Sequence, residues 1–75
     1  MFDKNIFASR LLELRKSRNL NQSKTGEIVG LTQTAITKIE KGERAASIEV
    51  LCALADYFDV SLDYLVGRSD DPTRH

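Results

Sequence analysis

Two short helical segments joined by a glycine turn constrain the fold of this chain more than any other feature. Asn21 is a favourable N-cap for a helix over Gln22–Val29, and Gly30 then supplies the positive φ that commonly ends a helix. Thr32 is a second N-cap, and it precedes a helix over Gln33–Glu40 that ends there or one residue later. Two helices of about eight residues with so tight a turn between them have the geometry of a helix-turn-helix.

Helical spacing of apolar residues recurs on both sides of this segment, and strict alternation is absent. The spacing predicts a helix over residues 7–18. Ser47 and Ser61 are N-caps for two more helices, Ile48–Phe58 and Leu62–Val66. The longer of these two helices is expected to bury one face, formed by Ile48, Leu51, Ala55 and Phe58. Leu54 and Cys52 are expected to flank this face.

These elements predict one all-α domain of five short helices over residues 7–67. Residues 1–6 are expected to form an N-terminal arm, and the polar residues 68–75 a flexible tail. No run approaches the roughly 18 apolar residues of a membrane span, and the first six residues have no signal-peptide pattern. A single cysteine, Cys52, allows no internal disulfide, which indicates a reducing compartment, the cytosol or nucleus.

Charge is distributed unevenly although the net charge is zero. Residues 1–44 hold nine basic and five acidic residues, whereas residues 45–75 hold two basic and six acidic ones. Such asymmetry has two interpretations, a half of the chain that faces a polyanion or chance polarity in a short chain.

The segment Gln22 to Lys41 also resembles the twenty-residue helix-turn-helix signature. That signature has a small residue at its fifth position, glycine at its ninth and apolar residues at four further positions. The matching residues are Gly26, Gly30, Val29, Leu31, Ile36 and Ile39. With "LELRKSRNLNQ", "GLTQTAITKIEKGER" and "VSLDYLVG", residues 7–67 resemble the Cro/C1-type (XRE, lambda-repressor-like) helix-turn-helix regulators of bacteria and phages. Two positions depart from the pattern, namely Thr25, which is usually apolar, and Ala46, where proline is frequent.

The resemblance implies a cytoplasmic transcriptional regulator, most readily a repressor, that binds double-stranded DNA with its third helix in the major groove. Four exposed side chains of that helix are then the expected base readers: Gln33, Thr34, Thr37 and Lys38. Phosphate contacts are expected from Asn21, Gln22, Lys24, Lys41 and Arg44. Gln22 is further implied to brace Gln33.

Two more roles follow from the resemblance. An ion pair between Arg15 and Glu40 is implied, and it would fix the angle of the third helix. Family members usually pair on inverted repeats, and the last helix is our candidate for self-contact. Its candidate residues are Leu62, Tyr64, Leu65 and Val66, of which Leu62 and Leu65 also suit the core and Tyr64 and Val66 the contact.

Two rival functions are weighed against DNA binding. An antitoxin or protein-interaction module with the same fold would use the acidic surface formed by Asp56, Asp59, Asp63, Asp70 and Asp71. An enzyme fits poorly, because the single histidine, His75, is the last residue and Cys52 is expected in the core. We expect no cofactor, no metal ion, no membrane contact and no small-molecule substrate.

Overall fold

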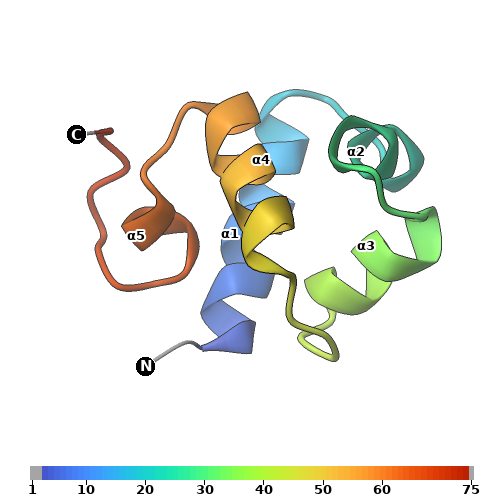
Figure 1. Ribbon diagram of the computed structural model, residues 1–75, viewed down its shortest axis with the longest axis horizontal. Helices are drawn as coiled ribbons and strands as arrows, with labels where there is room; N and C mark the ends of the chain where they lie inside the picture. Colours follow the sequence, from blue (N-terminus) through green and yellow to red (C-terminus); the bar gives the residue numbers. More distant parts are fainter. Residues whose placement is uncertain (1–2, 75) are drawn as a thin grey trace.

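The computed structural model describes residues 3–74, and within them every regular element is a helix (Figure 1). The helices are α1 (Lys4–Ser17), α2 (Gln22–Val29), α3 (Gln33–Glu40), α4 (Ile48–Phe58) and α5 (Leu62–Leu65). The predicted all-α, five-helix domain is confirmed. Among the described residues α1 is the longest helix, and no helix combines the length and apolar character needed to cross a bilayer.

Every helix begins at a side chain that caps its first turn. Asn21, Thr32, Ser47 and Ser61 each accept a hydrogen bond from the backbone N–H three residues later, as their residue types predict. The fifth cap lies upstream of the predicted start of the first helix. Asp3 accepts from the backbone N–H of Asn5 at 2.8 Å, so α1 begins at Lys4 and residues 4–6 belong to the helix instead of an arm. Residues 1 and 2 lie outside the described chain.

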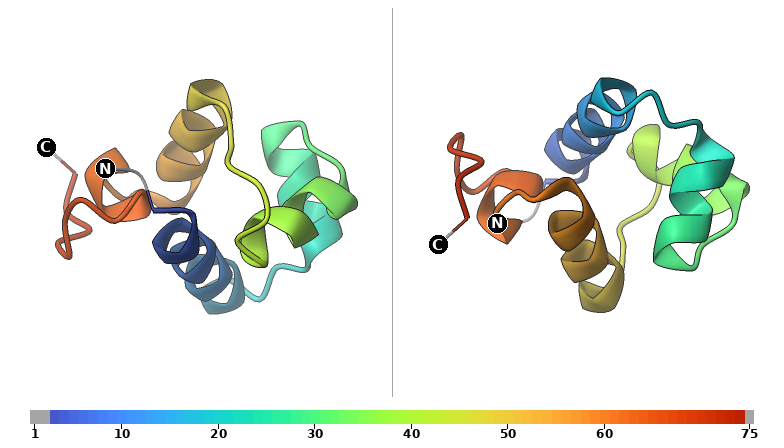
Figure 2. Two further views of the ribbon diagram at one scale, coloured as in Figure 1. Left: turned by 90° about the horizontal axis from the view of Figure 1, so that it is seen from below. Right: turned by 90° about the horizontal axis from the view of Figure 1, so that it is seen from above.

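The helices are arranged in three parts (Figure 1). α1 and α4 occupy the middle, α2 and α3 lie on one side, and α5 with the residues after it lies on the other. The two perpendicular views keep this order (Figure 2). The core runs through the middle part and is formed by Phe7, Leu11, Ile39, Leu51, Leu54, Ala55, Phe58, Val60 and Leu65.

The buried face of α4 differs from the predicted one. Leu51, Leu54, Ala55 and Phe58 are buried, but the side chain of Ile48 is 63% exposed and Cys52 is exposed. At about 100° per residue, Ile48 points roughly 70° and Cys52 roughly 110° away from the middle of the buried arc. Cys52 is therefore a surface residue, and the expectation that it lies in the core was wrong.

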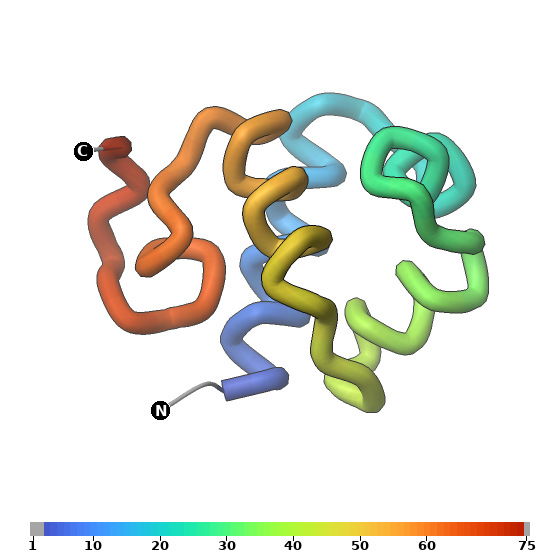
Figure 3. The backbone as a smooth tube through the Cα atoms, viewed as in Figure 1, coloured from blue at the N-terminus to red at the C-terminus, as the bar shows by residue number. Residues whose placement is uncertain are grey.

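The polar residues after α5 pack against the domain, although the sequence predicts a loose tail. The chain bends back alongside α5 (Figure 3), and the backbone N–H of Ser61 donates to the carbonyl of Pro72 at 2.9 Å. Arg74 Nη1 donates to the carbonyl of Ala55 at 3.0 Å, and Nη2 lies 2.7 Å from Asp56 Oδ1. Residues 68–74, the predicted tail, thus pack against the domain, and we call this segment the strap. His75 lies outside the described residues.

Candidate nucleic-acid interface

The turn between α2 and α3 depends on two glycines for different reasons. Gly30 lies at φ 77° and ψ 28°, a left-handed conformation that glycine adopts without strain. Gly26 is buried, and a Cβ built on it would collide with the carbonyl oxygen of Leu31, whose own N–H donates to the Gly26 carbonyl at 2.8 Å. The lack of a side chain at Gly26 therefore lets the backbone of the turn pack against α2. This close contact fixes where α3 begins.

Apolar side chains hold α3 against the middle helices. Ile36 and Ile39 are fully buried and Ala35 is nearly so, while Val29 and Leu31 pack at the edge of the core. The departure at Thr25 is accommodated locally, because its side chain is buried and its hydroxyl donates to the carbonyl of Asn21 at 3.0 Å. The polar atom is therefore satisfied inside α2, as a buried hydroxyl requires.

The opposite face of α3 meets solvent. Gln33, Thr34 and Lys38 are exposed, but Thr37 is half-buried. The Thr37 hydroxyl lies 2.7 Å from Gln22 Oε1 and 3.0 Å from the carbonyl oxygen of Gln33, and both partners can only accept its proton. Three of the four expected base readers are thus free to reach a partner, whereas the hydroxyl of Thr37 already has one inside the protein.

Arg15 and Glu40 lie together in a bidentate ion pair. Arg15 Nε is 2.6 Å from Glu40 Oε2, and Arg15 Nη2 is 3.0 Å from Oε1. The side chains are only 13% and 5% exposed, and Arg15 Nη1 also donates to the carbonyl of Leu20 at 2.8 Å. The pair ties the end of α3 to α1 and to the loop before α2.

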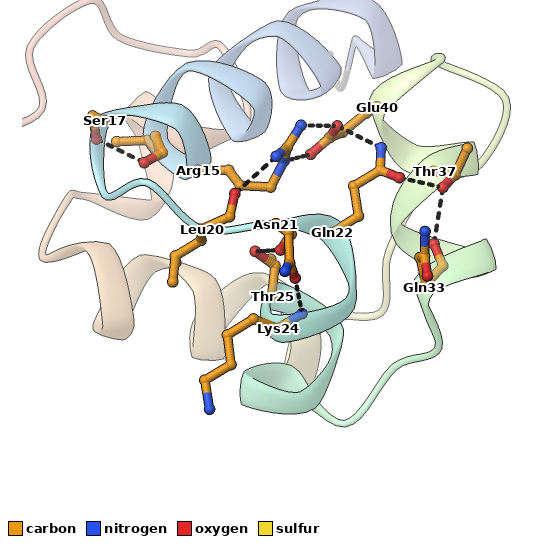
Figure 4. A network of polar contacts seen from close by, with 11 residues as sticks. Arg15, Ser17, Leu20, Asn21, Gln22, Lys24, Thr25, Gln33, Thr37 and Glu40 are labelled. Atoms are coloured by element: carbon orange, nitrogen blue, oxygen red, sulfur yellow. Dashed lines mark hydrogen bonds and ion pairs between the residues drawn. The ribbon is translucent and has the colours of Figure 1, made fainter.

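Gln22 joins this pair to the middle of α3 (Figure 4). Its Nε2 donates to Glu40 Oε1 at 3.0 Å, and its Oε1 accepts from Thr37. The resemblance implied a brace between Gln22 and Gln33, but the bonding partners of the Gln22 side chain are Glu40 and Thr37.

The other expected phosphate contacts are exposed around this face. The side chain of Asn21 is used as a cap, since its Oδ1 accepts from the N–H of Lys24 at 2.7 Å. Lys24 lies 3.7 Å from Glu27 in a solvent-exposed pair that leaves the amine accessible. Lys41 and Arg44 are exposed and form no ion pair with the described residues.

The candidate self-contact residues of α5 are mostly engaged within the chain. Leu65 is fully buried, so it belongs to the core and cannot form a contact surface. Leu62, Tyr64 and Val66 are half-buried. The ring of Tyr64 is covered by the guanidinium of Arg10, which lies 3.9 Å from the ring centroid.

Sequence reasoning missed Arg10 as a structural residue. Its Nη1 donates to the carbonyls of Tyr64 and Ser69 at 2.6 and 2.8 Å, and its Nη2 lies 2.9 Å from Asp70. These partners are more than fifty residues away in the chain, so no local pattern could have named them. Arg10 thus clamps the strap to α1.

Comparison with known proteins agrees with this geometry. A helix-turn-helix family model, HTH_3, matches residues 11–65. The chain belongs to this family of Cro/C1-type regulators. The family comprises DNA-binding transcriptional regulators and is not a class of enzymes. Among residues 3–74, no three or more His, Cys, Asp or Glu side chains form a group that could hold a metal ion.

Relatives and solved structures cover most of the domain. The chain is 41% identical to the HTH-type transcriptional regulator AnsR of Bacillus subtilis over 59 residues, which are 79% of this chain and 51% of AnsR. The P22 c2 repressor, crystallised with a synthetic operator, superposes with a TM-score of 0.80 at 30% identity, covering 85% of this chain and 97% of that one. The restriction-modification controller protein C.AhdI of Aeromonas hydrophila gives 0.75 at 30% identity, covering 84% and 96%. The chain spans about half the length of AnsR, and 60% and 58% of the lengths of two further Bacillus subtilis regulators.

Proposed function

We propose that this domain is the operator-reading part of a bacterial or phage transcriptional repressor, with α3 placed in the major groove of double-stranded DNA. The observation that carries the proposal is the exposed polar start of α3, held against the core by Ile36 and Ile39 and by the buried Arg15–Glu40 pair. The same fold in the P22 c2 repressor, a structure determined with a synthetic operator, supports it. Such a domain works in the cytoplasm, where the bacterial genome lies.

Three side chains are proposed to contact bases. Gln33 can form two hydrogen bonds with adenine N6 and N7, and Lys38 can donate to guanine O6 or N7. Thr34 can place its methyl group against the methyl group of thymine. Each good base contact contributes about 1–3 kcal/mol of discrimination between bases.

The surroundings of α3 are proposed to hold the DNA backbone. The first-turn N–H groups of α2 carry the positive end of the helix dipole, which favours a phosphate. Lys24, Lys41 and Arg44 add exposed positive charge. Such contacts position the protein but do not read the sequence.

We propose further that two copies bind an inverted repeat. The longest extent of the domain is 29 Å, so one copy covers one half-site, and half-sites lie about 34 Å apart when they repeat after one turn of DNA. Leu62 and Tyr64 on α5 and Val66 directly after it remain the candidate contact residues, and Leu65 is withdrawn because it is buried.

The test is selection of bound duplexes from a random DNA pool at near-physiological salt, since the affinity of such proteins depends strongly on salt. We expect enrichment of an inverted repeat with half-site centres about 10 base pairs apart. Gln33→Ala should then lose its preference at one base position of each half-site, at a cost of about 1–3 kcal/mol. No enrichment, with only weak salt-sensitive binding, would contradict the proposal.

The rival protein-interaction function receives little support from the acidic surface. Asp56 and Asp59 lie against Arg74, and Asp70 lies against Arg10. Two arginines therefore balance two of the five negative charges that a basic partner would recognise.

A further inference from the structure

A continuous chain of polar contacts connects the ends and the middle of three helices (Figure 4). It runs from Arg15 on α1 to Glu40 at the end of α3, then to Gln22 at the start of α2, and returns to α3 at Thr37. We call these four residues the relay. Its ion pair is nearly excluded from solvent, with Glu40 only 5% exposed. The Gln22 side chain contributes one N–H of its amide and its carbonyl oxygen to the relay.

The direction of every hydrogen bond in the relay is fixed by chemistry. The Glu40 carboxylate, ionised beside Arg15, can only accept, so the NH₂ group of Gln22 must face it. The carbonyl oxygen of Gln22 then faces Thr37, whose hydroxyl must donate. Turning the Gln22 amide over would set an oxygen against the Glu40 carboxylate, so the bond to Glu40 decides the orientation, although the Thr37 hydroxyl could then accept from the amide and donate to Gln33. The relay therefore has one arrangement, and it locks the rotamers of Gln22 and Thr37.

We propose that Gln22 and Thr37 are positioning residues for operator reading, and that neither side chain reads a base. This inference rests on the function proposed above. On DNA, the start of α2 would meet a phosphate while the first turn of α3 meets base edges, and the duplex fixes the distance between these groups. The relay is the polar connection that holds α2 and α3 at that separation. Recognition needs such placement to within about 0.5 Å.

The first experiment uses the free protein. NMR spectra of the Gln22 side-chain amide are compared between the wild type, Thr37→Val and Thr37→Ser. Valine has the shape of threonine without the donor, whereas serine keeps the hydroxyl. We expect Thr37→Val to shift the Gln22 amide resonances and Thr37→Ser to leave them close to the wild type. Unchanged resonances in Thr37→Val would overturn the relay.

The second experiment measures affinity for the duplex that the wild type enriches from a random pool and for a scrambled duplex of equal length. Thr37→Val should lower the ratio of the two affinities by about three- to tenfold, the usual contribution of one hydrogen bond, with an unchanged salt slope. Thr37→Ser should retain the ratio. Melting curves of each free variant confirm that it is folded at the temperature of the binding assay.

Two comparisons separate positioning from direct contact. If Gln22 and Thr37 act through each other, the double variant Gln22→Met/Thr37→Val loses no more than the worse single variant, whereas independent DNA contacts would multiply their losses. Thr34→Ser is the control for direct contact, since Thr34 is exposed on the same helix and serine lacks the methyl group proposed to meet thymine. It should weaken the preference for thymine at one position, and Thr37→Val should not.

The outcomes also distinguish the two proposals. A pool with no enriched duplex overturns the proposed function and the positioning role with it. A duplex that the wild type selects, but that Thr37→Val binds with an unchanged affinity ratio, overturns the positioning role alone. Multiplied losses in the double variant overturn it as well and assign both side chains to DNA contact.

Discussion

The α2–α3 end and the strap end of the molecule use the same chemical groups in different surroundings. At the α2–α3 end, Arg15 meets Glu40, whose side chain is 5% exposed. At the strap end, Arg74 meets Asp56, which is 70% exposed, and Arg10 meets the fully exposed Asp70. Breaking a buried ion pair strands a charge away from water, whereas an exposed carboxylate returns to solvent at little cost. Contact distances of 2.6 to 2.9 Å at both ends therefore predict unequal energetic consequences, because the burial of the pairs differs.

The largest effect is expected at Glu40. Glu40→Ala leaves Arg15 buried without its carboxylate and should lower the free energy of unfolding by about 3–5 kcal/mol. Glu27→Ala, in an exposed pair with Lys24, should change it by less than about 0.5 kcal/mol. Urea unfolding of both variants measures the difference. Equal stabilities would show that burial does not decide the cost of losing an ion pair.

Gly26→Ala should also destabilise the α2–α3 end. The added Cβ meets the backbone of Leu31, which cannot rotate away as a side chain can. We expect a loss of about 1–3 kcal/mol, in the range of overpacked sites. Gly30→Ala is the control, because a Cβ there has open space around it and meets only the strain of positive φ, about 1–2 kcal/mol. Thermal unfolding decides between them, and a smaller loss for Gly26→Ala would contradict the close approach.

Arg10 tests whether the strap end also holds one strong interaction. Its guanidinium donates to two carbonyls and covers Tyr64, and its side chain is largely buried. Arg10→Met keeps the apolar stem and removes these bonds, with an expected loss of about 1–2 kcal/mol. Asp70→Ala, which removes only the exposed partner, should have little effect. If urea unfolding showed the same loss of stability for both variants, the hydrogen bonds from Arg10 to the two carbonyls would not be what stabilises the strap end.

The smallest effect is expected at Arg74. The hydrogen bond to Asp56 raises the pKa of Arg74 above its usual value, but an arginine is charged in proteins even without such a shift. Arg74→Ala should leave the unfolding midpoint unchanged but speed amide hydrogen exchange at Ser61, whose N–H bonds to Pro72 in the strap. Arg68→Ala is the control, since Arg68 is exposed and forms no ion pair with the described residues. Equal exchange at Ser61 in both variants would contradict an anchoring role for Arg74.

The predictable parts of the candidate site are those that local chemistry decides. Asn21 and Thr32 cap α2 and α3 because their side chains reach the N–H groups three residues ahead. Gly30 ends α2 because positive φ favours glycine. These features lie within a few residues of each other, so the sequence is sufficient to locate both helices.

The less predictable parts connect residues far apart in the chain. Thr37 has a helical position that suits base reading, yet its hydroxyl bonds to Gln22, fifteen residues earlier. Cys52 and Ile48 have apolar character that suits a core, yet the packing of α4 against the rest of the domain leaves both outside its buried arc. Periodicity gives the angle between residues on a helix but not which arc meets its neighbours.

The sequence by itself determined that there are five helices, the caps of the last four and the helix-turn-helix, because helix formation and capping act over one or two turns. The tertiary structure alone decided the partners of Arg10, Gln22 and Arg74, and with them the relay and the strap. The physical reason is distance along the chain. A polar side chain bonds to the partner that folding brings within about 3 Å. Which residue that is depends on how the apolar core packs the helices together.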